Sequence, residues 1–197
     1  MTKLSLPGSY SYKSYYIDIY KILKVEQFEN LQYDVDYALK FSITKKEDLS
    51  SENFLVLEFS MFGKLFKNGN FPVNISYLLT ACGFASLSEE EQNKIIDEIL
   101  NKNLIVKQNL NDFFINKEIK LLKYVYRIDE NGFPKYKFWK GNVGFDCRKN
   151  IFSVNTSDKK IYEEFMKKVN DPNYPIADYL PELLKENLVD EEDDFLC

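Results

Sequence analysis

Residues 37–44 read "YALKFSIT", and every second residue of this stretch is large and apolar. Alternate side chains of an extended chain point to opposite faces, so this spacing gathers the apolar residues on one side. Antiparallel strands with one buried and one wet face have this pattern. The sequence therefore predicts a half-buried strand whose inward residues are Tyr37, Leu39, Phe41 and Ile43.

The stretches before and after this strand follow the same period. Residues 15–25, "YYIDIYKILKV", and residues 54–62, "FLVLEFSMF", are predicted to be its neighbouring strands. Strict alternation in the first of them places Val25 on the inward face, and Tyr16 and Tyr20 on the outward face. Three antiparallel strands are therefore expected in the first third of the chain.

The middle of the chain changes to helical spacing. Ser88 is followed three residues later by Glu91, which is the pattern of a capping box, and apolar residues then recur with a helical period. We expect a helix over 88–101, and before it a shorter helix over 74–81 that ends near Gly83.

Two further strands are predicted to form a hairpin. Residues 118–128 regain strand character, "ENGFP" at 130–134 is a turn with Asn-Gly and Pro, and the partner strand begins at 135. A helix over 157–169, capped by Ser157, follows the hairpin.

This order of elements predicts a mainly β protein with helices, of the α+β class. Five strands with a helix between the third and the fourth are typical of an OB-fold, so we expect an OB-like five-stranded barrel. The predicted organisation is an OB-like domain over 1–155, a C-terminal helical extension over 156–188 and a disordered acidic tail over 189–197.

The composition excludes several kinds of site. The 197 residues contain no histidine, which removes Ser-His-Asp and Cys-His catalysis and imidazole metal ligands. The three cysteines are odd in number and widely spaced, which predicts neither a disulfide framework nor a zinc site. No stretch resembles a signal peptide or the roughly 20 apolar residues of a membrane span. We therefore expect a cytoplasmic protein with no cofactor and no membrane partner.

Charge is distributed unevenly along the chain. The five acids at 190–194 equal the whole net charge of -5, so residues 1–189 sum to zero. Residues 169–189 hold four acids and one lysine, which leaves about +3 on residues 1–168. A mildly basic body with an acidic end is an asymmetry found in many nucleic-acid-binding proteins.

Residues 117–140 contain the densest mixture of cations and aromatic rings. Single-stranded nucleic acid needs this chemistry, because rings stack on unpaired bases and ammonium groups follow the phosphates. Alternation in this strand predicts that Ile119, Leu121 and Val125 face the core, and that Lys120, Tyr124 and Tyr126 face outward. The candidate nucleic-acid-binding residues are Lys120, Lys123, Tyr124, Tyr126, Arg127, Lys135, Lys137, Trp139 and Lys140.

Three other interpretations of the same residues stay open. A Tyr- and Phe-rich hairpin is also typical of a core element with one lysine-lined wet face. Glu118-Ile119-Lys120 matches the E-x-K half of a Mg²⁺ nuclease motif, in which the carboxylate holds the metal and the lysine supports the attacking water. A third alternative is an interaction protein whose acidic end binds a host factor without DNA.

The chain resembles a known family at several stretches. "YLLTACGF" (77–84), "LNKNLIVKQNL" (100–110) and "NKEIKLLKYVYRIDENG" (116–132), with the acidic end, are similar to phage-encoded single-stranded DNA-binding proteins of the OB-fold. The resemblance implies a non-enzymatic protein in the host cytoplasm that coats single-stranded DNA during phage replication and recombination.

The resemblance also gives the acidic tail a role. In this family the acids mimic phosphate and compete for the basic groove, while a terminal hydrophobe recruits host or phage replication and recombination proteins. Homo-oligomerisation stays open. The residues that would bind partner proteins are Asp190, Glu191, Glu192, Asp193, Asp194, Phe195 and Leu196.

Overall fold

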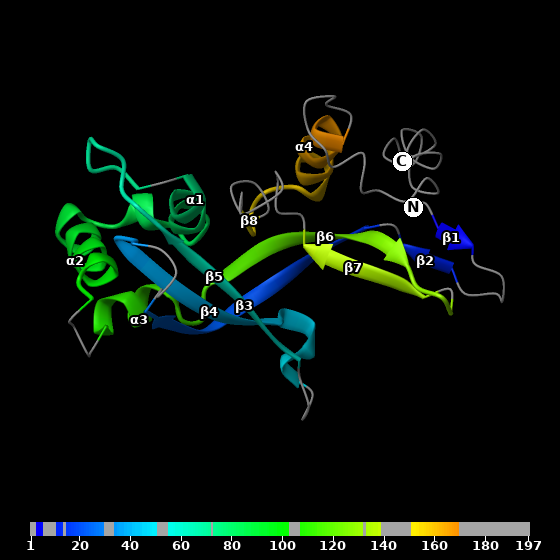
Figure 1. Cartoon of the computed structure of the whole chain (residues 1–197), viewed down its shortest axis with the longest axis horizontal. Coiled ribbons are helices and arrows are strands. Elements are labelled where there is room, and N and C mark those ends of the chain that lie inside the picture. Colours follow the sequence, from blue (N-terminus) through cyan, green and yellow to red (C-terminus); the bar gives the residue numbers. More distant parts are fainter. Residues whose placement is uncertain are drawn as a thin grey trace. The chain divides into compact units, whose positions relative to one another are not determined.

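A computed structural model gives the fold of the chain (Figure 1). It describes residues 3–5, 11–13, 15–29, 34–50, 55–71, 73–102, 107–131, 133–138 and 151–169. The described strands are β1 (Lys3–Ser5), β2 (Ser11–Lys13), β3 (Tyr15–Gln27), β4 (Tyr37–Lys45), β5 (Val56–Gly63), β6 (Glu118–Ile128), β7 (Pro134–Phe138) and β8 (Ile151–Ser153). The described helices are α1 (Val73–Ala81), α2 (Glu89–Leu100), α3 (Gln108–Phe114) and α4 (Asp158–Val169), with 3₁₀ turns at Lys46–Ser50 and Phe84–Ser86.

The chain divides into two compact units. The first, which we call the hairpin unit, comprises Met1–Ile17, Leu121–Asn150 and Ser157–Cys197, and so holds the β6–β7 hairpin and α4. The second, the helical unit, comprises Asp18–Lys120 and Ile151–Thr156. The predicted helical extension is described only as far as α4, and the predicted tail lies outside the described residues.

The larger sheet has the strand order β5-β4-β3-β6-β7, and β8 pairs with β6; β1 and β2 form a separate two-stranded sheet. The pairs β3–β4, β4–β5 and β6–β7 are antiparallel. Among the described strands, β5 and β7 end the path and do not pair with each other, so the sheet is not closed. The protein is thus a mixed α+β protein, as predicted, whereas the closed OB-like barrel is not observed.

Strand β4 is buried on both faces. Its predicted inward residues, Tyr37, Leu39, Phe41 and Ile43, are all buried as expected, but Ala38, Ser42 and Thr44 of the opposite face are buried as well, so the predicted half-buried strand is wrong. Thr44 was expected on the wet face, but its exposed fraction is 0% and its hydroxyl donates to the Leu55 carbonyl at 2.9 Å. The sequence pattern finds the more apolar face and cannot show that a second layer covers the other one.

A β-bulge in β3 makes the predicted faces of this strand wrong over its middle. Ile22 pairs with Ile43 and Lys24 pairs with Ser42, so Leu23 is an extra residue without a partner in β4. An extra residue reverses the alternation between the residues before it and those after it, so Tyr20 and Ile22 share the buried face with Val25. Tyr20 is consequently buried rather than outward.

The predicted helices 74–81, 88–101 and 157–169 are confirmed as α1, α2 and α4. Gly83 adopts a φ of 87° just beyond α1, a left-handed conformation that favours glycine. The capping box of α2 is present: the Ser88 hydroxyl accepts from the Glu91 N–H at 3.3 Å, and Glu91 Oε2 accepts from the Ser88 N–H at 2.9 Å.

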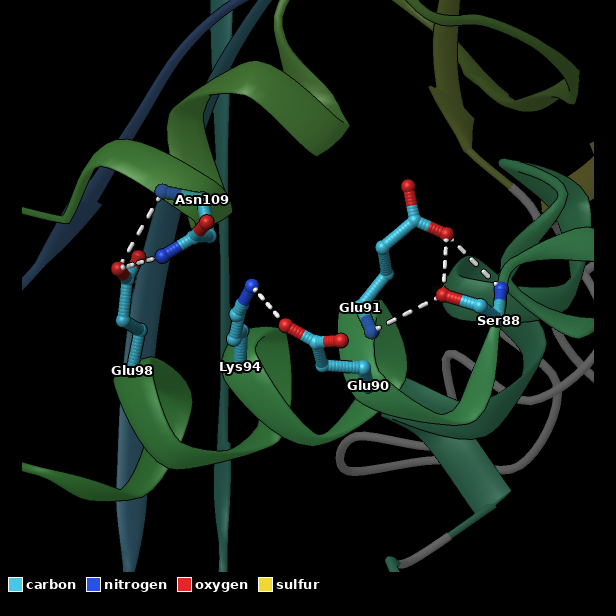
Figure 2. A network of polar contacts seen from close by, with 6 residues as sticks. All are labelled: Ser88, Glu90, Glu91, Lys94, Glu98 and Asn109. Atoms are coloured by element: carbon cyan, nitrogen blue, oxygen red, sulfur yellow. Dashed lines mark hydrogen bonds and ion pairs between the residues drawn. The ribbon is translucent and has the colours of Figure 1, made fainter.

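Helix α3 was not predicted, because its seven residues are too few for a periodic pattern. Figure 2 shows the Glu98 carboxylate of α2 reaching the start of this helix at Asn109. One carboxylate oxygen accepts from the Asn109 side-chain amide at 2.5 Å, and the other accepts from the Leu110 N–H at 2.8 Å. In return, the buried Lys107 ammonium donates to the Glu98 carbonyl at 2.7 Å. These contacts satisfy backbone groups that helix ends leave without partners.

Replacing Glu98 should therefore destabilise the helical unit. Glu98→Ala removes the acceptor of a buried backbone N–H, and an unsatisfied buried donor costs about 1–3 kcal/mol. Urea unfolding followed by circular dichroism measures the loss in the free energy of unfolding. The matched control is Glu90→Ala on the same helix, which removes only an exposed ion pair with Lys94 (Figure 2) and should change that free energy much less. Equal effects of the two variants would contradict this role of Glu98.

Candidate nucleic-acid interface

The turn of the β6–β7 hairpin is built around Asp129. One oxygen of its carboxylate accepts from the backbone N–H groups of Asn131 at 3.0 Å and Phe133 at 2.8 Å. The other oxygen forms an ion pair with Lys135 at 3.0 Å. The Phe133 N–H and the Lys135 ammonium lower the pKa of this carboxyl group. The predicted hairpin is confirmed, with its turn at the Asn-Gly sequence.

The register of the hairpin pairs backbone positions whose residues include cations and aromatic rings. The register pairs Lys123 with Phe138, Tyr124 with Lys137, and Arg127 with Lys135, so every one of these three positions brings at least one cation. The register shifts between Val125 and Arg127, which places Tyr126 at an irregularity of the strand. The register thus brings the backbone positions of these residues opposite one another, and the predicted binding surface stays a prediction.

Tyr124 was predicted to face outward, and this is wrong. Its exposed fraction is 5%, and its ring lies 5.4 Å from the ring of Phe165 in α4. Leu122 on the same side of β6 is also buried, so α4 and β6 form a packed layer in the hairpin unit. A ring buried in this way has no free face for a base. Tyr124 is a core residue.

Two of the candidate lysines are engaged by the chain itself. Lys120 is half-buried, and its ammonium donates to the Thr156 carbonyl at 2.8 Å. The Lys123 ammonium lies over the ring of Tyr16, 5.1 Å from its centroid, which is a cation–π contact. Lys135 is exposed and pairs only with Asp129 among the described residues. Of these three lysines, Lys135 is the one most accessible to a phosphate.

The remaining predicted residues cannot be assigned a position. Tyr126, Arg127 and Lys137 belong to the described strands, but their side chains do not belong to the described set. Trp139 and Lys140 lie entirely outside the described residues, as does the predicted partner-binding segment 190–197. Their roles stay predictions.

Sequence reasoning did not place Phe133 among the binding residues, although it is the most exposed ring among the described side chains of this hairpin. Phe133 lies in the turn and is 51% exposed, next to the cation Lys135 in the hairpin. The signal was present in "ENGFP", because a large ring between Asn-Gly and Pro at a hairpin turn is far from either core face. Phe133 replaces Tyr124 as the ring of this hairpin that a base can reach.

The E-x-K residues do not form a metal site in the described part of the chain. The Glu118 carboxylate pairs with Lys46 at 2.9 Å, and Lys120 is bonded to Thr156. No group of three or more Asp, Glu, Cys or His side chains that could hold a metal ion occurs among the described residues.

Comparison of the chain with models of protein families, with curated proteins and with solved structures finds no match. Within the described ranges, no helix has the length and apolar character needed to cross a membrane.

Two of the buried tyrosines, Tyr20 and Tyr124, predict a loss of stability at alkaline pH. Burial raises the pKa of Tyr124 from 10.0 to about 12, and burial together with the Asp18 carboxylate raises the pKa of Tyr20 to about 12. A tyrosine whose folded pKa is raised holds its proton longer in the folded state than in the unfolded state. Its contribution to stability is complete below pH 10 and is lost as the pH rises towards 12.

Tyr124→Phe should reduce the slope with which the free energy of unfolding falls as the pH rises. The reduction is at most about 1.4 kcal/mol per pH unit, which corresponds to one proton. Urea unfolding at a series of pH values between 9 and about 11.5 would measure the slope. Tyr20→Phe provides an independent second variant. An unchanged slope in both variants would show that neither hydroxyl is protected by burial.

Proposed function

We propose that the protein binds single-stranded DNA along the β6–β7 hairpin, without catalysis and with little sequence preference. The observation that carries the proposal is the exposed turn of this hairpin, where the Phe133 ring and the Lys135 ammonium lie two residues apart in the sequence and the backbone position of Lys135 is paired with that of Arg127. Alternating cations and rings fit a strand of unpaired bases joined by phosphates. Phe133 supplies the exposed ring, and Trp139 is proposed as a second one on the basis of its place in the sequence.

The net charge of residues 117–140 also supports nucleic-acid binding by this hairpin. Residues 117–140 hold seven cations and three acids, a net charge of +4, while the chain as a whole has -5. Two of those acids, Glu118 and Asp129, are already paired with lysines. Exposed ion pairs contribute little to stability, so a phosphate can compete with Asp129 for the Lys135 ammonium. This local excess of positive charge would attract a polyanion despite the net charge.

The strand order supports an OB-like interpretation of the fold. β3 is a long strand of 13 residues that pairs with β4, and β6 follows β3 in the strand order. Helices α1 to α3 lie in sequence between β5 and β6, which are the third and fourth of these five strands in chain order. Pairing of β5 with β7 would close this path into a barrel, and OB-folds are themselves partly open barrels. We therefore propose an OB-like fold whose fourth and fifth strands present the nucleic-acid surface.

The proposed function predicts that Phe133→Ala and Trp139→Ala each weaken binding to labelled oligo-dT by about 1–3 kcal/mol. Fluorescence anisotropy at several salt concentrations measures the affinity, and log K should fall with log[salt] by about 0.7 for each phosphate neutralised. Tyr77→Ala, which removes an exposed ring from the uncharged helix α1, is the matched control for both variants.

The same titration separates the alternatives. Retention of the oligonucleotide without cleavage, with and without Mg²⁺, supports the proposal. Mg²⁺-dependent cleavage would replace it by the nuclease interpretation based on Glu118 and Lys120. Absence of both binding and cleavage would overturn both and leave the interaction protein.

The acidic tail is proposed to regulate this binding and to recruit replication or recombination proteins. Five carboxylates tethered to a basic body compete with DNA at an effective concentration set by the linker. Deletion of 190–197 should therefore tighten oligo-dT binding by a modest factor that shrinks as salt screens the competition. The double change Phe195→Ala with Leu196→Ala should leave DNA affinity nearly unchanged, because the acids stay. Equal affinity of the full-length and truncated proteins at low salt would show that the acids do not compete.

A further inference from the structure

The turn after β5 displays an aromatic ring in the helical unit. We call residues 64–70 the Phe66 turn. Phe66 is 53% exposed, the second most exposed of the large apolar residues in the described ranges. Exposure of a single large ring is ordinary when its segment is loose. The Phe66 turn is instead held by several hydrogen bonds.

Three backbone groups fix the turn internally. The Phe66 N–H donates to the Asn70 carbonyl at 2.9 Å, and the Gly69 N–H donates to the Phe66 carbonyl at 2.8 Å. Gly69 has a φ of 80°, which only glycine adopts readily, and the Asn70 N–H donates to Asn68 Oδ1 at 3.1 Å. At the base of the turn, the Leu65 N–H donates to the Asp36 carboxylate at 2.8 Å. The ring is thus presented by an ordered turn, which lowers the entropic cost of binding a ligand there.

Charge in this segment is positive only. Between Glu58 and Glu89 the sequence has no acid and two cations, Lys64 and Lys67. Lys64 pairs with Asp34 at 2.6 Å, so the base of the turn is neutralised by the aspartates that precede β4. Lys67 is exposed and forms no ion pair with the described part of the chain. The tip of the turn therefore combines an exposed ring with an adjacent ammonium.

We infer that Phe66 and Lys67 form a second contact for single-stranded nucleic acid, in which a base stacks on the ring and its phosphate meets the ammonium. A nucleotide offers a flat apolar face and an anion close to each other, which adjacent residues 66 and 67 complement. A protein partner would need a far larger apolar patch than one ring. This inference rests on the proposed function and assigns part of it to the helical unit.

The experiment places a fluorescent reporter at the turn of the full-length protein. The chain has one tryptophan, so Phe66→Trp combined with Trp139→Phe has a single indole at position 66. Stacking of a base should quench its fluorescence as oligo-dT is added, with the midpoint that anisotropy gives for the same variant. The control is Tyr77→Trp combined with Trp139→Phe. Its indole lies on α1, a helix without charged residues, and its fluorescence should not be quenched.

Affinity provides the second measurement. Phe66→Ala should weaken oligo-dT binding by about 5- to 100-fold, the range expected for one lost stacking contact. Lys67→Glu should also weaken it, whereas Lys67→Arg should preserve it. Circular dichroism and thermal melting check that each variant is folded.

The outcomes separate this inference from the proposed function. Binding by the wild type, with no quenching at position 66 and wild-type affinity in Phe66→Ala, would overturn the second contact and leave the hairpin intact. No binding by the wild type would overturn the proposed function together with this inference. Quenching at position 66 with weakened binding in Phe66→Ala supports the contact.

Discussion

The contacts of Phe41 hold the helical unit together. Its ring stacks on Phe59 of the neighbouring strand β5, with centroids 5.1 Å apart and planes 15° apart, and meets Phe114 of α3 edge-on at the same centroid distance. Aromatic pairs of this kind contribute about 0.5–1.5 kcal/mol beyond the burial of their area. The side chain of Phe41 therefore connects β4, β5 and α3.

Helix α3 depends on this packing and on the polar contacts with α2. A helix of seven residues is too short to be stable alone, so its place follows from Phe114 and Leu110 in the core and from the Glu98 carboxylate at its first turn. At the same junction, the buried Lys107 ammonium donates a hydrogen bond to the backbone carbonyl of Glu98 in the last turn of α2. These charges stabilise a helix junction and are not available for chemistry.

Contacts within the protein also decide which cations and rings can bind a ligand. Lys120 and Lys123 make contacts within the protein, and Tyr124 packs under α4, so a count of cations and rings in the sequence overstates the surface they offer. Phe133 and Phe66 lie at turns, where no second layer covers them. Exposed rings beside lysines at two turns are the features that the proposed binding of single-stranded DNA requires.

The sequence by itself determined the period of each long element, the capping box of α2, the turn of the hairpin and the identity of the inward face of β4, because local hydrogen bonding and alternation act over a few residues. Its errors have a common cause. Tyr20 was misplaced by a bulge, and Tyr124 and Thr44 by a second packed layer. Only the tertiary structure decided these positions, the existence of α3 and the open path of the sheet, since each depends on contacts between residues far apart in the chain. The candidate binding segment stays a prediction, and within it Tyr124 is buried rather than outward, because a segment is chosen by composition whereas a side chain is exposed or buried by what packs against it.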